Sequence, residues 1–138
     1  MRLLNVHGRL QNRNVTKYLM KWNKGSRTKI QTAVKKFLKP YWKDQVVYEE
    51  FPVYGTRLKV DILNATKKIA IEVQGRQHTE FNKFFHNNSR LEYLKSIKRD
   101  VQKRNWLEAN DFKVIEIDET EITSLSKTFF ERKFKIGL

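Results

Sequence analysis

The chain has 138 residues, with 29 Lys and Arg against 15 Asp and Glu, a net charge of +14, and no Cys. This length is typical of one domain with a sizeable core. With 39% hydrophobic and 12% aromatic residues, the composition excludes an intrinsically disordered chain. The lack of Cys excludes disulfides, thiolate metal sites and a Cys nucleophile. The sequence has neither a secretory signal nor the ~20 consecutive apolar residues that span a membrane, so we expect a cytoplasmic protein with no membrane partner.

The excess positive charge lies in the first third of the sequence. Residues 1–43 contain twelve Lys or Arg and no acidic residue, whereas the remainder has seventeen basic residues against fifteen acidic ones. Basic side chains that neutralise phosphates gain affinity by releasing counterions, so nucleic acid is the expected partner. A basic surface without a polyanionic partner is the alternative. Residues 1–25 show little periodicity and are interpreted as a basic N-terminal arm, and residues 26–138 as a single domain.

The hydrophobic pattern predicts alternating helices and strands after a short helix near residues 15–22. Helices are expected at residues 26–38, 89–110 and 120–133, and strands at residues 46–53, 58–63, 69–74 and 112–117. This order, α-β-β-β-α-β-α, predicts an α/β fold with a mixed sheet of about four strands flanked by helices. Ser26 is expected to cap the first helix and Pro40 to end it. The long second helix is expected to bury an apolar stripe formed by Leu91, Leu94, Ile97 and Val101.

Two carboxylates, Asp61 and Glu72, lie in the middle of neighbouring strands. Side chains alternate along a strand, so Asp61 shares a face with Lys59, and Glu72 with Gln74. If the strands pair through the turn at residues 64–67, both carboxylates can meet on one polar face. Such carboxylates are costly unless they are solvated, paired or bound to a metal. Their oxygen atoms suit Mg²⁺ or Mn²⁺.

The stretch from Asp61 to Glu72-Val73-Gln74, in a hairpin preceded by a helix, resembles the PD-(D/E)XK nuclease superfamily. The resemblance covers residues 26–117 in the order of elements but only a few residues in identity. It implies a restriction-endonuclease-like core with Mg²⁺, or Mn²⁺ in its place, held by Asp61, Glu72 and the carbonyl of Val73. Gln74 stands at the catalytic position where Lys is usual and cannot supply its positive charge. Lys59 or Arg76 would supply that charge instead.

The following residues resemble the very-short-patch-repair endonucleases and the free-standing homing endonucleases related to them. The segment Ile71-Glu72-Val73-Gln74-Gly75-Arg76-Gln77-His78 matches their strand followed by His, and Arg99-Asp100 matches an Arg-Asp pair on the next helix. The resemblance implies that His78 polarises the attacking water or protonates the leaving oxygen. The alternative is a loop histidine without a catalytic role. Asp100 either orients His78 or, as we favour, pairs with Lys103 or Arg104 on its own helix.

Further candidates flank this motif. Glu49 and Glu50 are expected on opposite faces of their strand, so at most one can join the site. We favour Glu50 as a further catalytic ligand, with a solvated edge charge as the alternative. The aromatic residues of the basic segment either stack on bases or, as we favour, pack on the sheet; these are Trp22, Tyr41 and Trp42.

These observations predict a Mg²⁺-dependent endonuclease that hydrolyses double-stranded DNA. The resemblance favours a homing-type enzyme of a phage or mobile element, acting in the cytoplasm of a bacterial host. A junction-resolving endonuclease fits the size and charge equally well. A non-catalytic DNA-binding module would explain Gln74, and an RNA-associated basic protein would explain the arm but not the carboxylates. Cutting both strands is simplest for a homodimer, whereas a monomer can nick one strand. The residues predicted to bind DNA are Arg2, Arg9, Arg13, Lys17, Lys21, Lys24, Arg27, Lys29, Lys35, Lys36, Lys59 and Arg76.

Overall fold

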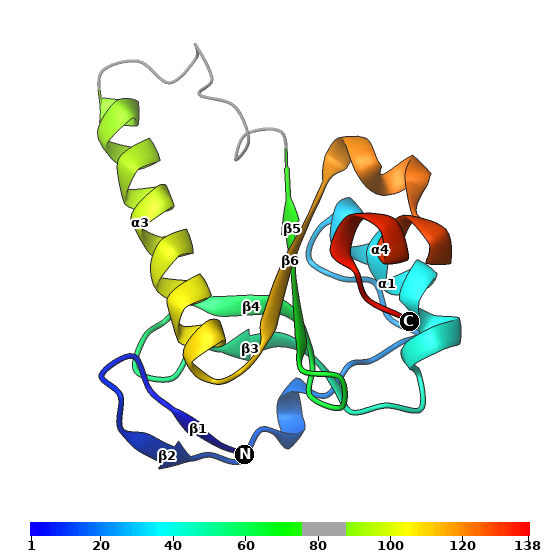
Figure 1. Cartoon of the computed structure of the whole chain (residues 1–138). Coiled ribbons are helices and arrows are strands. Elements are labelled where there is room, and N and C mark those ends of the chain that lie inside the picture. Colours follow the sequence, from blue (N-terminus) through cyan, green and yellow to red (C-terminus); the bar gives the residue numbers. More distant parts are fainter. Residues whose placement is uncertain (76–87) are drawn as a thin grey trace.

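The computed structural model describes residues 1–75 and 88–138 (Figure 1). Its centre is a four-stranded sheet with the order β3-β4-β5-β6. The first three strands are antiparallel, and β6 runs parallel to β5. The bounds of these strands are β3 (Val47–Pro52), β4 (Lys59–Asn64), β5 (Ile69–Gln74) and β6 (Lys113–Asp118). The predicted α/β fold with a mixed four-stranded sheet and flanking helices is confirmed.

Helices cover both faces of the sheet and create two cores. On one face, Trp106 and Leu107 of α3 (Asn88–Ala109) pack against the sheet together with Leu3 of β1 (Arg2–Leu4). On the other face, Leu38 of α1 (Lys29–Trp42) and Phe130 of α4 (Lys127–Phe134) contact the sheet. Single strands contribute to both cores: in β4, Val60 and Leu63 belong to the first core and Ile62 to the second. In the part of the chain described here, no helix has the length and apolarity needed to span a membrane.

Residues 1–25 are attached to the domain by their backbone. β1 pairs with β2 (Leu10–Asn12) in a hairpin, and a single 3₁₀ turn, η1 (Thr16–Tyr18), stands where a short helix was expected. Side chains of the body hold the start of the chain: Trp106 Nε1 donates to the Leu4 carbonyl over 2.6 Å, Asn110 Oδ1 accepts the Leu4 N–H over 2.8 Å, and the Tyr54 hydroxyl donates to the Met1 carbonyl over 2.7 Å. The beginning of the chain therefore contributes to the first core.

Two helix boundaries differ from the prediction. α1 begins after Thr28, whose side chain accepts the backbone N–H of Gln31, so Thr28 and not Ser26 caps this helix. Pro40 lies inside the last turn of α1 and does not end it, because two more helical residues follow. The predicted final helix is divided into η2 (Glu119–Ser124) and α4, because Ser126 caps a new helix at the Phe129 N–H.

The predicted burial of the apolar stripe on the long helix is wrong. Its apolar stripe is 42% to 56% exposed, because the first turns of α3 extend beyond the sheet (Figure 1). Among the side chains of α3 whose burial the structure describes, Trp106 and Leu107, near its end, are buried against the sheet. The basic-segment aromatics follow the packing alternative in part: Trp42 is fully buried and Trp22 packs on the second core, whereas Tyr41 is exposed.

Candidate active site

Asp61 and Glu72 meet where strands β4 and β5 separate. The last paired residues of this antiparallel ladder are Ile62 and Ile71. Beyond this pair, carboxylate oxygens accept the backbone N–H groups in place of main-chain carbonyls. Val73 N–H donates to Asp61 Oδ2 over 2.9 Å, and Asp61 N–H donates to Glu72 Oε2 over 3.2 Å. Each carboxylate is therefore fixed by the opposite strand, as groups at a preorganised site must be.

Glu72 is the most electrostatically strained group of this pair. Glu72 is 7% exposed. Burial is the larger cause and the neighbouring charge of Asp61 the second, and together they raise the pKa of Glu72 to about 8. The ammonium of Lys103, whose Nζ lies 2.6 Å from Glu72 Oε1, opposes this rise. Because desolvation and like charge both disfavour the ionised form, a second cation beside the pair would stabilise it.

The pair faces a cleft of about 550 Å³ between the start of α1, the ends of β4 and β5, and the middle of α3. The surface is mixed in charge, with basic, acidic and amide side chains close together. The described residues that line it are Arg27, Thr28, Ile30, Gln31, Asp61, Glu72, Val73, Gln74, Gly75, Asp100, Lys103 and Glu119. The structure thus brings together the four residues of the predicted motif, Asp61 and Glu72-Val73-Gln74.

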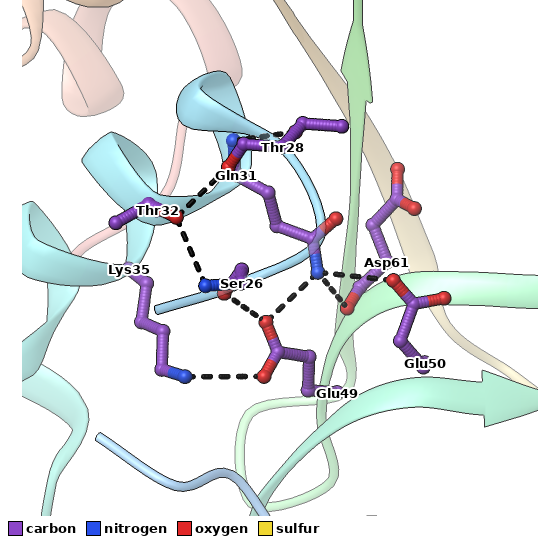
Figure 2. A network of polar contacts seen from close by, with 8 residues as sticks. All are labelled: Ser26, Thr28, Gln31, Thr32, Lys35, Glu49, Glu50 and Asp61. Carbon is purple, nitrogen blue, oxygen red and sulfur yellow. Dashed lines mark hydrogen bonds and ion pairs between the residues drawn. The ribbon is translucent and has the colours of Figure 1, made fainter. Parts of the chain in front are cut away.

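Gln31 of α1 connects this cleft to a second polar cluster (Figure 2). Its amide Nε2 donates to Glu49 Oε2 over 2.8 Å and to Glu50 Oε1 over 3.3 Å, and it makes a long contact of 3.5 Å with the Asp61 carbonyl. The ammonium of Lys35 lies 3.1 Å from Glu49 Oε1, and the Ser26 hydroxyl donates to Glu49 Oε2. The cluster therefore links the start of α1 to the backbone of Asp61.

The prediction that Glu49 and Glu50 point to opposite faces is wrong. Glu50 has a φ of 53°, a left-handed conformation inside strand β3 that interrupts the alternation of side chains. As a result both carboxylates contact the Gln31 amide, and Tyr48 and Phe51 belong to the same core. Glu50 is absent from the described residues that line the cleft, so it contacts Gln31 rather than completing the carboxylate pair.

The remaining candidates for catalysis fall in different places. Lys59 is exposed and is not one of the cleft-lining residues in the described ranges. His78 and Arg76 lie outside the described residues. Asp100 lines the cleft, and its two expected partners bind other carboxylates: Lys103 binds Glu72 and Arg104 binds Glu116.

Lys103 is the cleft residue that the motif comparison missed. It stands three residues after Asp100, so helical spacing places both side chains on one face of α3. That spacing, together with the need of a buried carboxylate for a counter-charge, was the signal available in the sequence.

Most of the residues predicted to bind DNA are exposed, and Lys35 is the exception. Lys35 is 1% exposed and its ammonium binds Glu49, so the predicted phosphate contact does not fit the structure. Its position on the helix face that packs on the sheet accounts for this burial. The Arg13 guanidinium lies over the Tyr54 ring, 5.1 Å from its centroid. The exposed basic residues of the predicted set are Arg2, Arg9, Arg13, Lys17, Lys21, Lys24, Arg27, Lys29, Lys36 and Lys59.

The donor atoms of the cleft fit a small divalent cation. Among residues 1–75 and 88–138 there is no group of three or more His, Asp or Glu side chains that could hold a metal ion. The carboxylates of Asp61 and Glu72 lie together in this cleft, and the motif resemblance would add the Val73 carbonyl; all of these are oxygen donors. Mg²⁺ is usually held by one or two carboxylates and keeps several water ligands, so this set suits Mg²⁺ better than a metal that needs a complete protein cage.

Comparisons with known proteins give viral relatives. The chain is 28% identical over 102 residues to "Uncharacterized protein 033L" of Invertebrate iridescent virus 3, covering 73% of this chain and 52% of that protein. It is 38% identical over 69 residues to "Uncharacterized protein 094L" of Frog virus 3, covering 50% of this chain and 44% of that protein. The chain thus matches about half the length of each relative. No model of a known protein family matches it, and no solved structure matches it.

Proposed function

We propose that the chain is a divalent-cation-dependent DNA endonuclease of the PD-(D/E)XK type. The observation that carries this proposal is that the carboxylates of Asp61 and Glu72 line one cleft, each held by a backbone N–H of the opposite strand. A strongly perturbed carboxylate with a specific charge partner in a cleft is typical of a functional site. The net charge of +14 supports a polyanionic substrate. The viral origin of both relatives supports a viral rather than a cellular enzyme.

The residues of the cleft divide the chemistry between them. Asp61, Glu72 and the Val73 carbonyl would hold the cation, which when bound would neutralise phosphate charge and make water more acidic. The hydrogen bonds from Val73 N–H and Asp61 N–H keep both carboxylates in place before substrate binds. Exposed Arg27, at the cleft, would contact the DNA backbone. Phosphate contacts of this kind position DNA without specifying its sequence.

A non-catalytic DNA-binding module is the second candidate, and Gln74 favours it. A neutral amide at this position removes the positive charge that the PD-(D/E)XK motif places beside the phosphate. Such a module would keep the basic surface and bind DNA without cutting it. The carboxylate pair argues against this candidate, since a binding module gains nothing from a buried charge repulsion.

The test is cleavage of two substrates. Wild type, Asp61→Asn and Glu72→Gln are incubated with supercoiled plasmid and with a four-way junction, in Mg²⁺ and in EDTA. Glu108→Gln is the matched control, because Glu108 is an exposed carboxylate of α3 outside the cleft. We expect Mg²⁺-dependent cleavage by wild type and Glu108→Gln, and its loss in both cleft variants.

The products then separate the alternatives. Cleavage of the junction in preference to the plasmid would identify a junction-resolving enzyme, and the reverse would favour the homing type. Linear plasmid formed in one step would indicate a homodimer, whereas accumulated nicked circles would indicate a monomer acting on one strand. DNA binding without cleavage in Mg²⁺ or Mn²⁺ would replace the nuclease by the binding module.

A further inference from the structure

Helix α3 brings one ammonium group to the carboxylate pair. Lys103 Nζ lies 2.6 Å from Glu72 Oε1, and the Lys103 side chain is 17% exposed. Lys103 lines the same cleft as Asp61, Val73 and Gln74. The charge is thus held in a partly dehydrated space, where electrostatic interactions are stronger than in bulk water.

Gln74 occupies the same side of β5 as Glu72, because side chains alternate along the strand. Its amide is neutral, so the end of β5 presents a carboxylate but no positive charge. Lys59, the substitute suggested by the sequence, is exposed and is not one of the described residues that line the cleft. Lys103, in contrast, lines the cleft that contains the carboxylate pair.

We propose that Lys103 supplies, from helix α3, the positive charge that Gln74 cannot supply from strand β5. This inference rests on the proposed nuclease function. In the reaction, a water oxygen forms a bond to phosphorus and the bond from phosphorus to the 3′ oxygen breaks. The attacking water loses one proton and the leaving 3′ oxygen gains one. Negative charge grows on the phosphate oxygens during the attack, and a preorganised ammonium stabilises that charge.

Lys103 can change its partner during this reaction. Its four-carbon stem is flexible, and an ammonium group makes hydrogen bonds in several directions. A divalent cation on Glu72 would weaken the ion pair between Glu72 and Lys103. The ammonium then turns from Glu72 Oε1 to a phosphate oxygen in the same cleft. A purely structural Lys103 would instead remain the counter-ion of a buried carboxylate.

Three variants separate these roles: Lys103→Met, the double variant Lys103→Met with Gln74→Lys, and Lys98→Met. Lys98 is the matched control because it is exposed on the same helix and lines a different groove, beside the N-terminal hairpin. Two quantities are measured for each protein. One is the single-turnover cleavage rate constant at saturating DNA, on plasmid and on a four-way junction. The other is the dissociation constant for Mn²⁺ alone, by calorimetry without DNA.

We expect opposite effects on the two quantities. Lys103→Met slows cleavage by about 100-fold, as expected for a lost transition-state charge contact. The same variant binds Mn²⁺ several-fold more tightly, because a competing positive charge has been removed. Adding Gln74→Lys restores cleavage to within about tenfold of wild type, since the charge returns to the same cleft. Lys98→Met leaves both quantities unchanged.

The contrary results are distinct. If Lys103→Met cleaved DNA at the wild-type rate, the inference would be overturned. It would also be overturned if Lys103→Met lost both cleavage and Mn²⁺ binding and Gln74→Lys restored neither, because a structural residue behaves in this way. Lys103→Met could slow cleavage and tighten Mn²⁺ binding as expected, while Gln74→Lys fails to restore cleavage. That result would show that a charge at position 74 cannot replace the charge of Lys103. A wild type that binds Mn²⁺ and DNA but cuts neither substrate would overturn the nuclease proposal itself.

Discussion

The side chains of Asp61 and Glu72 each accept a backbone N–H from the opposite strand at the end of the β4–β5 ladder. Val73 N–H donates to Asp61 Oδ2 over 2.9 Å, and Asp61 N–H donates to Glu72 Oε2 over 3.2 Å. The two carboxylates thereby replace the main-chain acceptors that the separated strands no longer supply. This arrangement has a cost, since it brings two negative charges together at a buried position.

The first prediction is that Mg²⁺ binding depends on pH through Glu72. Burial and the Asp61 charge raise the pKa of Glu72 to about 8, so at pH 7 a cation must displace a proton. The apparent Mg²⁺ affinity should rise about tenfold for each pH unit between pH 6 and pH 8 and then level off. Calorimetry in buffers of different ionisation enthalpy measures both the affinity and the proton released. A constant affinity from pH 6 to pH 9 would show that Glu72 holds no cation.

The second prediction is that Glu72→Gln stabilises the fold at alkaline pH. A folded pKa of about 8 exceeds the unfolded value of 4.5, so the stability that Glu72 contributes is fully present below pH 4.5 and is lost as pH rises through 8. Gln does not titrate and avoids this loss. Relative to wild type, the free energy of unfolding of Glu72→Gln should gain roughly 2–4 kcal/mol between pH 4.5 and pH 9.

Urea denaturation at the two pH values checks this second prediction, with Glu108→Gln as the exposed control. The control should shift by less than about 0.5 kcal/mol between the same pH values. An equal gain in both variants would assign the effect to net charge rather than to the site. If Glu72→Gln gained stability and lost cleavage, the wild-type Glu72 would be a residue that lowers stability while it supports function.

The sequence predicts the strands of this site better than its helices. β5 runs from Ile69 to Gln74 as expected, because β-branched residues occupy every second position of this segment. Helix α3 was placed to within one residue, but its apolar stripe is exposed, since periodicity indicates a helix without saying how far it extends beyond its sheet. Lys103 reaches Glu72 from 31 positions along the chain, so its spacing from Asp100 indicates its helix face but does not identify Glu72 as its partner.

Glu50 shows a different limit of sequence reasoning. Alternation along a strand predicts that Glu49 and Glu50 lie on opposite faces. The left-handed backbone conformation of Glu50 interrupts this alternation. Glu has no special preference for this conformation, so the deviation leaves no mark in the sequence. The predicted exposure of Lys35 fails for a similar reason: a lysine in a helix is usually exposed, and here a tertiary contact with Glu49 buries it.

The third prediction compares two adjacent lysines of α1. Lys35 is buried against Glu49, whereas Lys36 is exposed. Lys35→Met leaves a buried carboxylate without its cation and should lower the free energy of unfolding by about 3 kcal/mol. Lys36→Met should change it by less than about 0.5 kcal/mol. Chemical denaturation measures both changes.

Lys36→Met, which should barely change stability, should have the larger effect of the two variants on DNA binding. Lys36→Met removes an exposed phosphate contact, so the slope of log affinity against log salt should fall by about 0.9. Lys35→Met should leave this slope unchanged, because its ammonium does not reach the surface. Fluorescence anisotropy with a labelled duplex at several salt concentrations measures the slopes. A loss of slope in Lys35→Met alone would contradict the burial of Lys35.

The last prediction concerns the backbone of Glu50. Its φ of 53° favours Gly, which has no Cβ to clash in the left-handed region. Glu50→Gly and Glu50→Ala both remove the carboxylate, so their difference isolates the backbone, and Gly should be the more stable by about 1 kcal/mol. Glu116, an exposed residue of β6 without a positive φ, is the control, and there Ala should be the more stable. If Ala were also preferred at position 50, that residue would have ordinary strand geometry, and the Gln31 amide would not contact both Glu49 and Glu50.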